Sequence, residues 1–68
     1  MAYKAAKVRR ALERAFVRSR QRGSHVQFEV GGSTVTFAYH DRVELGDRQL
    51  RKVAKEFGLT LDELKDLL

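Results

Sequence analysis

The feature that most constrains the fold is an alternation of apolar and polar residues on both sides of Gly31-Gly32. Two successive glycines supply the two positive φ angles that a type I′ turn requires, so the pattern predicts a tight β-hairpin. The register that collects the apolar side chains has three facing pairs, Val30 with Ser33, Phe28 with Val35 and Val26 with Phe37. Because this register puts one hydrophobic set on one face, the hairpin must bury that face and leave the other polar.

Helical patterns lie on both sides of the hairpin. Apolar residues repeat every three or four positions in residues 5–15, which predicts a helix whose other face is basic. The same spacing returns at residues 50–57 and ends at Gly58, the residue type expected just after a helix. The run from Thr60 to Glu63 is a capping box, which predicts a short third helix whose leucines face the core or a partner. Residues 17–20 predict a short strand, residues 21–24 a turn and residues 41–46 a polar connection.

This order of elements predicts an α+β sandwich in which helices cover one face of an antiparallel sheet. A chain of 68 residues suffices for one small domain, spanning residues 1–68, and excludes a two-domain enzyme. It has no Cys, which removes disulfides, thiolate zinc sites and cysteine nucleophiles. No apolar run approaches the roughly 20 residues of a membrane span, and no signal-peptide core follows Met1, so we expect a cytoplasmic protein without membrane contact.

Positive charge gathers near the start of the sequence. The chain carries a net charge of +5, and residues 1–22 hold eight basic side chains against the single acidic Glu13. The eight are Lys4, Lys7, Arg9, Arg10, Arg14, Arg18, Arg20 and Arg22. Such a segment would attract an RNA or an acidic protein by an electrostatic field that salt weakens, although a merely solvated helix face has the same composition.

Imidazole and guanidinium groups are the side chains left for chemistry. Two His 15 residues apart and a lone Glu29 form no recognisable metal site, and neither a nucleophile triad nor a phosphate loop fits the sequence. Histidine can take and return a proton near neutral pH, which suits cleavage of RNA by its own 2′-hydroxyl group. By strand alternation, His25 and His40 would face away from the core about 7–8 Å apart if the strands pair that far.

Three segments resemble the HicA-type mRNA interferase toxins. Residues 16–25 are similar to a Phe-led strand that runs into Gly-Ser-His, and residues 35–40 resemble the family's Val-Thr-Val-Pro-x-His strand. Residues 44–60 resemble its closing helix. The chain departs from the family pattern at Ala15, Ala38, Gly46 and Arg48. The resemblance implies a double-stranded-RNA-binding-like α-β-β-β-α sandwich with a short C-terminal helix, metal-independent mRNA cleavage without a cofactor, and a HicB-type antitoxin as partner.

The resemblance also implies roles for particular residues. His25 falls on the family's catalytic His, Gly23 would let the backbone approach the substrate, and Ser24 would position the ring or bind phosphate. The expected substrate-binding set is Arg18, Arg20, Arg22, Gly23, Ser24 and His40, with no metal ligand. Two alternatives stay open, namely a non-catalytic RNA-binding module and a basic interaction subunit for an acidic partner protein.

Overall fold

Three helices, a three-stranded sheet and a two-stranded sheet make up the described part of the chain, residues 2–68 of a computed structural model. The elements follow one another as β1 (Tyr3–Lys4), α1 (Ala5–Ala15), β2 (Val17–Arg22), β3 (His25–Val30), β4 (Ser33–Phe37), β5 (Glu44–Leu45), α2 (Asp47–Glu56) and α3 (Leu61–Leu67). This is the α+β order expected from the sequence, with helix, three antiparallel strands and helices in turn.

Strands β2, β3 and β4 form an antiparallel sheet with β3 in the centre. The predicted hairpin register is confirmed, since Val30 pairs with Ser33 and Val26 pairs with Phe37. Gly31 and Gly32 have φ angles of 55° and 82°, the positive values that the tight turn needs. The hairpin therefore turns one face of its apolar residues toward the helices, as the alternation indicated.

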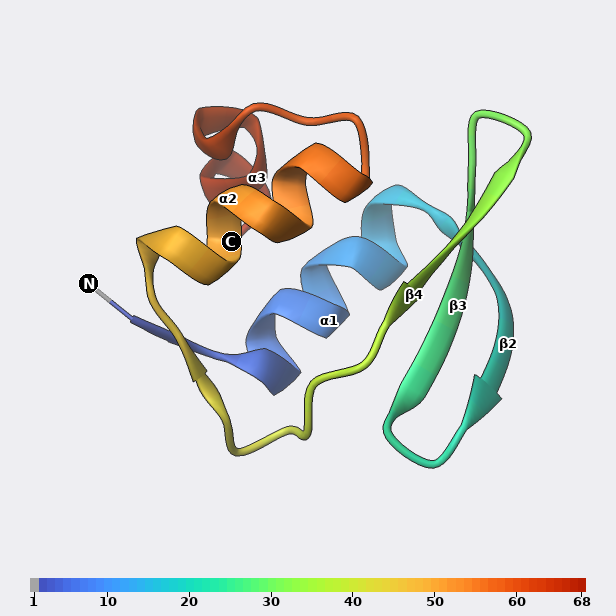
Figure 1. Ribbon diagram of the computed structural model, residues 1–68, viewed down its shortest axis with the longest axis horizontal. Coiled ribbons are helices and arrows are strands. Elements are labelled where there is room, and N and C mark those ends of the chain that lie inside the picture. The colour runs from blue at the N-terminus through green and yellow to red at the C-terminus, as the bar shows by residue number, and fades with distance from the viewer. Residues whose placement is uncertain (1) are drawn as a thin grey trace.

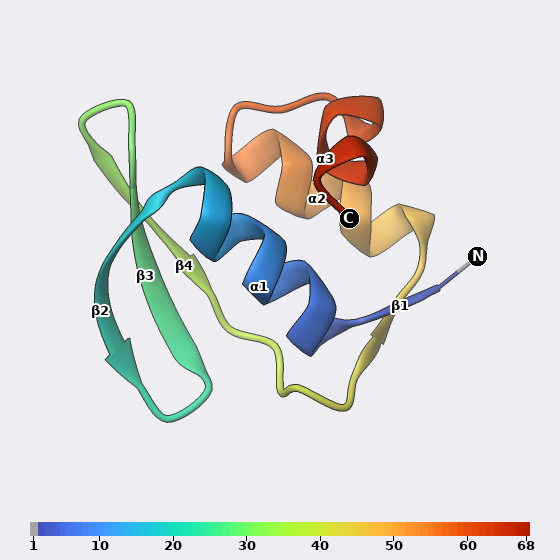
Figure 2. The same ribbon diagram turned by 180° about the vertical axis from the view of Figure 1, so that it is seen from behind.

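The three helices lie on the same side of the sheet, and the other sheet face is bare (Figures 1 and 2). Side chains from both layers meet in a continuous core, in which Phe28 of β3 makes an edge-on contact with Phe57 at 5.4 Å between ring centroids. Every residue of β2 is exposed. The sheet thus offers a polar outer surface at one end of the molecule.

The helix-ending signals in the sequence are confirmed. Gly58 follows α2 with a φ of +70°. At the start of α3 the Thr60 hydroxyl accepts a hydrogen bond from the Glu63 amide at 3.1 Å, and the Glu63 carboxylate accepts one from the Thr60 amide at 2.8 Å. Leu64 is fully buried, so this helix packs on the core.

Several sequence-based boundaries are wrong. Residues 21 and 22 continue β2 instead of forming a turn, because they pair with β3. The expected polar connection contains β5, which pairs with β1 and buries Leu45 completely. Ala15, expected on the apolar stripe, is exposed at the end of α1.

Candidate functional site

The Gly-Ser-His motif forms the tight turn between β2 and β3 and the first residue of β3. Arg22 pairs with His25, which leaves Gly23 and Ser24 as a two-residue loop. Gly23 has a φ of +60°, and a two-residue hairpin loop of type II′ needs glycine at this first position. The backbone requirement explains the glycine, and the tight loop places His25 at the start of the central strand β3.

His25 lies in an open groove on the bare face of the sheet. The groove has a volume of about 330 Å³ and is lined by Arg20, Arg22, His25, Gln27 and Thr36. Arg20 and Arg22 come from β2, opposite Gln27 and His25 respectively, so the cations and the imidazole are cross-strand neighbours. Among residues 2–68, no acidic side chain lines this groove. The groove thus places an exposed imidazole beside two guanidinium groups.

A bulge at Ser19 decides which arginines reach the groove. The pairing of β2 with β3 shifts between Arg18 and Arg20, so Ser19 is the extra residue. Regular alternation would put Arg18, Arg20 and Arg22 on one face, but an extra residue reverses the alternation beyond it. The two later arginines therefore face outward, while the first faces the helix side.

Arg18 is held in a different environment. It pairs with Phe28, a core residue whose side chain points to the helices. Its guanidinium forms an ion pair with Glu13 at 3.1 Å and donates a hydrogen bond to the side-chain amide oxygen of Gln21 at 2.8 Å. The structure thus separates Arg18 from the two groove arginines with which the sequence grouped it.

His40 lies beyond the end of β4 and is not part of the sheet. The pairing of β4 with β3 ends at Phe37, so the condition for two neighbouring imidazoles on the outer face is not met. The chain then turns back, and the backbone amides of Ala5 and Ala6 donate to the carbonyls of Val43 at 2.7 Å and Asp41 at 3.2 Å. Amides at the start of a helix lack partners within the helix, so this connection satisfies α1. It carries His40 off the sheet and into a second hollow.

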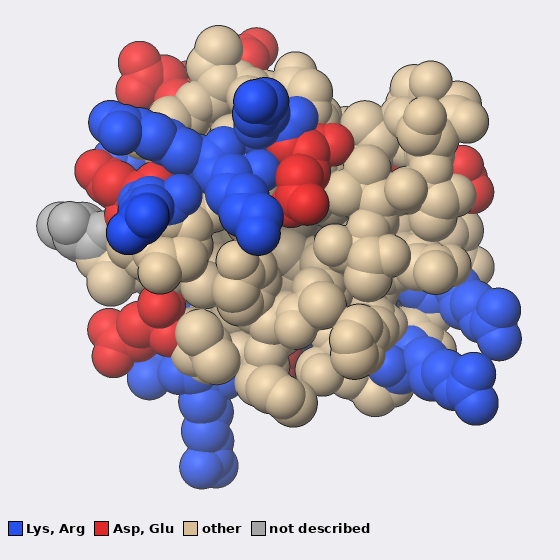
Figure 3. All heavy atoms as spheres, in the orientation of Figure 1, with Lys and Arg blue, Asp and Glu red and all other residues tan. Residues whose placement is uncertain are grey.

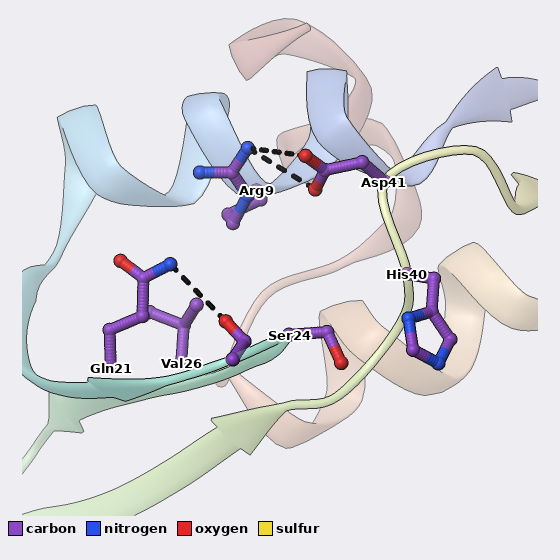
Figure 4. A pocket seen from close by; sticks show the side chains of 7 residues that line it. Arg9, Gln21, Ser24, Val26, His40 and Asp41 are labelled. Carbon is purple, nitrogen blue, oxygen red and sulfur yellow. Dashed lines mark hydrogen bonds and ion pairs between the residues drawn. The ribbon is translucent and has the colours of Figure 1, made fainter.

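That second hollow, here called the Asp41 pocket, lies between α1, the β2–β3 loop and the connection after β4. Its volume is about 290 Å³, and its lining comprises Arg9, Gln21, Gly23, Ser24, Val26, His40 and Asp41. Figure 4 shows Arg9 on α1 joined to Asp41, with Gln21 and Ser24 on the hairpin and His40 on the connection. Ser24 and His40, both predicted to bind substrate, are thus together in this pocket and not in the groove of His25.

Positive charge is spread over more of the surface than the sequence indicated. Two N-terminal arginines already have partners within the protein. Arg14 donates a hydrogen bond to the carbonyl of Leu67 at 2.9 Å, and Arg9 forms ion pairs with two carboxylates. Exposed cations also gather over α2 (Figure 3), where they are Arg48, Arg51, Lys52 and Lys55. Nearby, a hydrogen bond and the charge of Lys65 hold the pKa of Asp47 below its usual value.

Some lining residues were missed from the sequence. Gln27 and Thr36 face each other on the outer side in the predicted register, so their proximity to His25 could have been found from it. Arg9 and Asp41 carry no such signal, because their ion pair joins residues 32 positions apart. In residues 2–68, His, Asp and Glu side chains do not gather in threes that could hold a metal ion. No helix in the same range is long and apolar enough to cross a membrane.

Comparison with known families identifies the class of protein to which this small α+β domain belongs. The model of the HicA toxin family, from bacterial toxin-antitoxin systems, matches residues 5–59. This match covers most of the chain, so the protein belongs to the HicA toxin family. Comparisons with curated proteins and with solved structures found no match.

Proposed function

We propose that this chain is the toxin of a type II toxin-antitoxin pair and that it cleaves mRNA without a metal ion, with His25 as the catalytic residue. The observation that carries the proposal is the open groove that joins His25 to Arg20 and Arg22. The chain's membership of the HicA toxin family supports the same conclusion.

The groove supplies the groups that RNA transesterification needs. The His25 imidazole would accept the proton of a ribose 2′-hydroxyl as that oxygen bonds to the adjacent phosphorus. The bond from phosphorus to the 5′-oxygen then breaks, and the protonated imidazole or a water returns a proton to this leaving oxygen. The products are a 2′,3′-cyclic phosphate and a 5′-hydroxyl, so atoms and charge balance without a further reactant.

The two groove arginines would stabilise the negative charge that grows on the phosphate. A guanidinium group donates paired hydrogen bonds to phosphate oxygens and keeps its charge at every physiological pH. Groups placed before the reaction at the site of developing charge lower the barrier more than groups that must reorganise. Arg20 and Arg22 extend from a strand paired with β3, which would keep the two cations near His25 before the reaction begins.

A HicB-type antitoxin would neutralise the toxin by covering this groove. No helix of the described chain covers the outer face of the sheet (Figure 1). The groove lies on that face and is lined by two arginines. An acidic partner surface would both associate rapidly and block access of RNA. The proposed location, the bacterial cytoplasm, is where mRNA and antitoxin are both available.

The experiment uses a DNA oligonucleotide with a single ribonucleotide and an all-DNA control, both incubated with the protein in excess chelator. We expect cleavage only at the ribonucleotide, with a cyclic phosphate end detected by mass spectrometry. Binding of both oligonucleotides without cleavage would instead favour a non-catalytic RNA-binding module. Cleavage that the chelator abolishes, or products with a 3′-hydroxyl, would overturn the mechanism.

A further inference from the structure

The Asp41 pocket and the groove of His25 lie on opposite sides of one tight loop. Ser24 lines the pocket, and the next residue, His25, lines the groove. An RNA strand whose reacting phosphate lies at His25 therefore needs to pass only this two-residue loop to reach the pocket. The pocket is thus placed to receive a nucleotide next to the one that reacts.

The charges of the two hollows differ. The described residues that line the groove include two arginines and none with an acidic side chain, which suits phosphate oxygens. In the pocket, Arg9 is shared by Asp41 at 3.2 Å and Glu13 at 3.5 Å, so its positive charge is already balanced. The side chain of Asp41 is 63% exposed and keeps carboxylate lone pairs for a ligand. Glu13 is also paired with Arg18 at 3.1 Å, so this cluster of two cations and two carboxylates has no net charge and offers a phosphate no net attraction. A neutral group with N–H donors would find an acceptor in the Asp41 carboxylate.

The pocket is also fixed before any ligand arrives. The Arg9 side chain is only 19% exposed and is held between its two carboxylates. Both ends of the Gln21 amide are occupied, because its oxygen accepts from Arg18 at 2.8 Å and its nitrogen donates to the carbonyl of Gly23 at 3.3 Å. Side chains that are already ordered lose little entropy on binding. Single-stranded RNA bases are recognised by such fixed polar groups together with planar side chains such as the His40 imidazole.

We infer that the Asp41 pocket binds the base of the nucleotide next to the cleaved linkage and selects bases that carry an exocyclic amine over uracil. This inference rests on the proposed function, because the groove of His25 defines the position of the strand. The Asp41 carboxylate accepts a hydrogen bond from the amine of adenine, cytosine or guanine. Uracil has no amine, and its single donor on this edge, N3–H, lies between two carbonyl oxygens that would face the carboxylate, so uracil is accepted less well.

The test measures binding, so that it does not depend on cleavage. Short 2′-O-methyl oligouridylates, which cannot react, receive adenine, cytosine or guanine at each position in turn, and fluorescence anisotropy gives the Kd of each. A hydrogen bond to an exposed charged group predicts that each amine base at the pocket position lowers Kd about tenfold relative to uracil. In Asp41→Asn and Asp41→Ala the gain should fall below about twofold. Asp62→Asn, which removes an exposed carboxylate from α3, should keep the full gain.

Each other outcome overturns the inference. A gain for adenine and guanine but not cytosine, unchanged in Asp41→Asn, would indicate stacking alone. Equal tightening of all oligonucleotides in Asp41→Asn and Asp62→Asn would indicate only a change in net charge, and the absence of any binding would remove the site. Failure of the proposed function looks different, since base-selective binding would then occur while a cleavable RNA stayed intact. Thermal unfolding of the Asp41 variants checks that the fold is kept.

Discussion

Alanine substitutions at three arginines test how the bulge at Ser19 divides the basic residues. Arg20 and Arg22 lie on the outer face with His25, whereas Arg18 lies on the helix side and is paired with Glu13. If the RNA phosphates bind in the groove, then Arg20→Ala and Arg22→Ala should each remove one phosphate contact. Arg18→Ala should remove none, although all three substitutions change the net charge equally.

The magnitude follows from counterion release. Each phosphate contact on a single strand contributes about 0.7 to the slope of log affinity against log salt. Raising the salt from about 50 to about 200 mM should therefore lower the RNA affinity of the parent about 2.6-fold more than that of Arg20→Ala or Arg22→Ala. Compared with the variant that carries both substitutions, the parent's affinity should fall about sevenfold more. Arg18→Ala should show the slope of the parent.

The assay is fluorescence anisotropy with a 2′-O-methyl RNA, repeated at several salt concentrations. Slopes are compared rather than single Kd values, because a long-range charge effect shifts affinity for all three variants. If Arg18→Ala flattens the slope as much as Arg20→Ala, the strand does not follow the groove. In that case the division of the arginines by the bulge has no functional meaning.

Three further predictions concern stability and the partner. Phe28→Ala, which empties a fully buried site against Phe57, should lower the free energy of unfolding by about 3–5 kcal/mol. The whole free energy of unfolding of a domain this small is only about 3–10 kcal/mol, so urea denaturation should show little remaining stability. Lys65→Met should lower the Tm slightly at neutral pH, because Lys65 holds the pKa of Asp47 below its usual value of 3.8. A lowered carboxyl pKa gives stability that is present above the usual value and lost as the pH falls through the lowered one. A Tm difference between the parent and Lys65→Met that persists in stronger acid would therefore contradict the ion pair. Arg22→Glu should weaken the binding of a HicB-type antitoxin at least about tenfold, as measured by calorimetry, if that partner covers the groove. An unchanged affinity would place the partner on another surface.

The central hairpin could be predicted in register because two independent signals agree. The glycines at 31 and 32 fix the turn, and the alternation of apolar residues selects the same pairing. A slip by one residue would expose Val26 and Phe28, so burial enforces this register. The capping box at Thr60 and the glycine at 58 worked for a similar reason, since each acts through its nearest neighbours along the chain.

The details of β2 could not be predicted in the same way. Its sequence from Val17 to Arg22 has no apolar residue after the first, and every position is exposed. Burial therefore sets no register, and nothing in the local pattern marks Ser19 as the extra residue. The consequence for function is that three arginines with regular spacing were assigned to one surface, whereas the structure divides them between two.

The placement of His40 and Asp41 depended on contacts distant in sequence. Alternation extended past Phe37 would place His40 outward, but the connection instead satisfies free amides at the start of α1. The pairs of β1 with β5 are two residues long, which is too short for a periodic signal. The Asp41 pocket is formed by such tertiary contacts. The sequence therefore predicted the exposed position of His25 but not the neighbouring pocket.

The most direct measurement compares His25→Ala with His40→Ala in RNA cleavage under excess chelator. The two substitutions remove the same chemical group, from the groove in one case and from the Asp41 pocket in the other. We predict that His25→Ala loses about 10²–10⁴-fold in rate, the usual contribution of a positioned proton-transfer group, while His40→Ala retains cleavage and changes mainly its base preference. Full activity of folded His25→Ala, or equal loss in both variants, would contradict the assignment of the reaction to the groove.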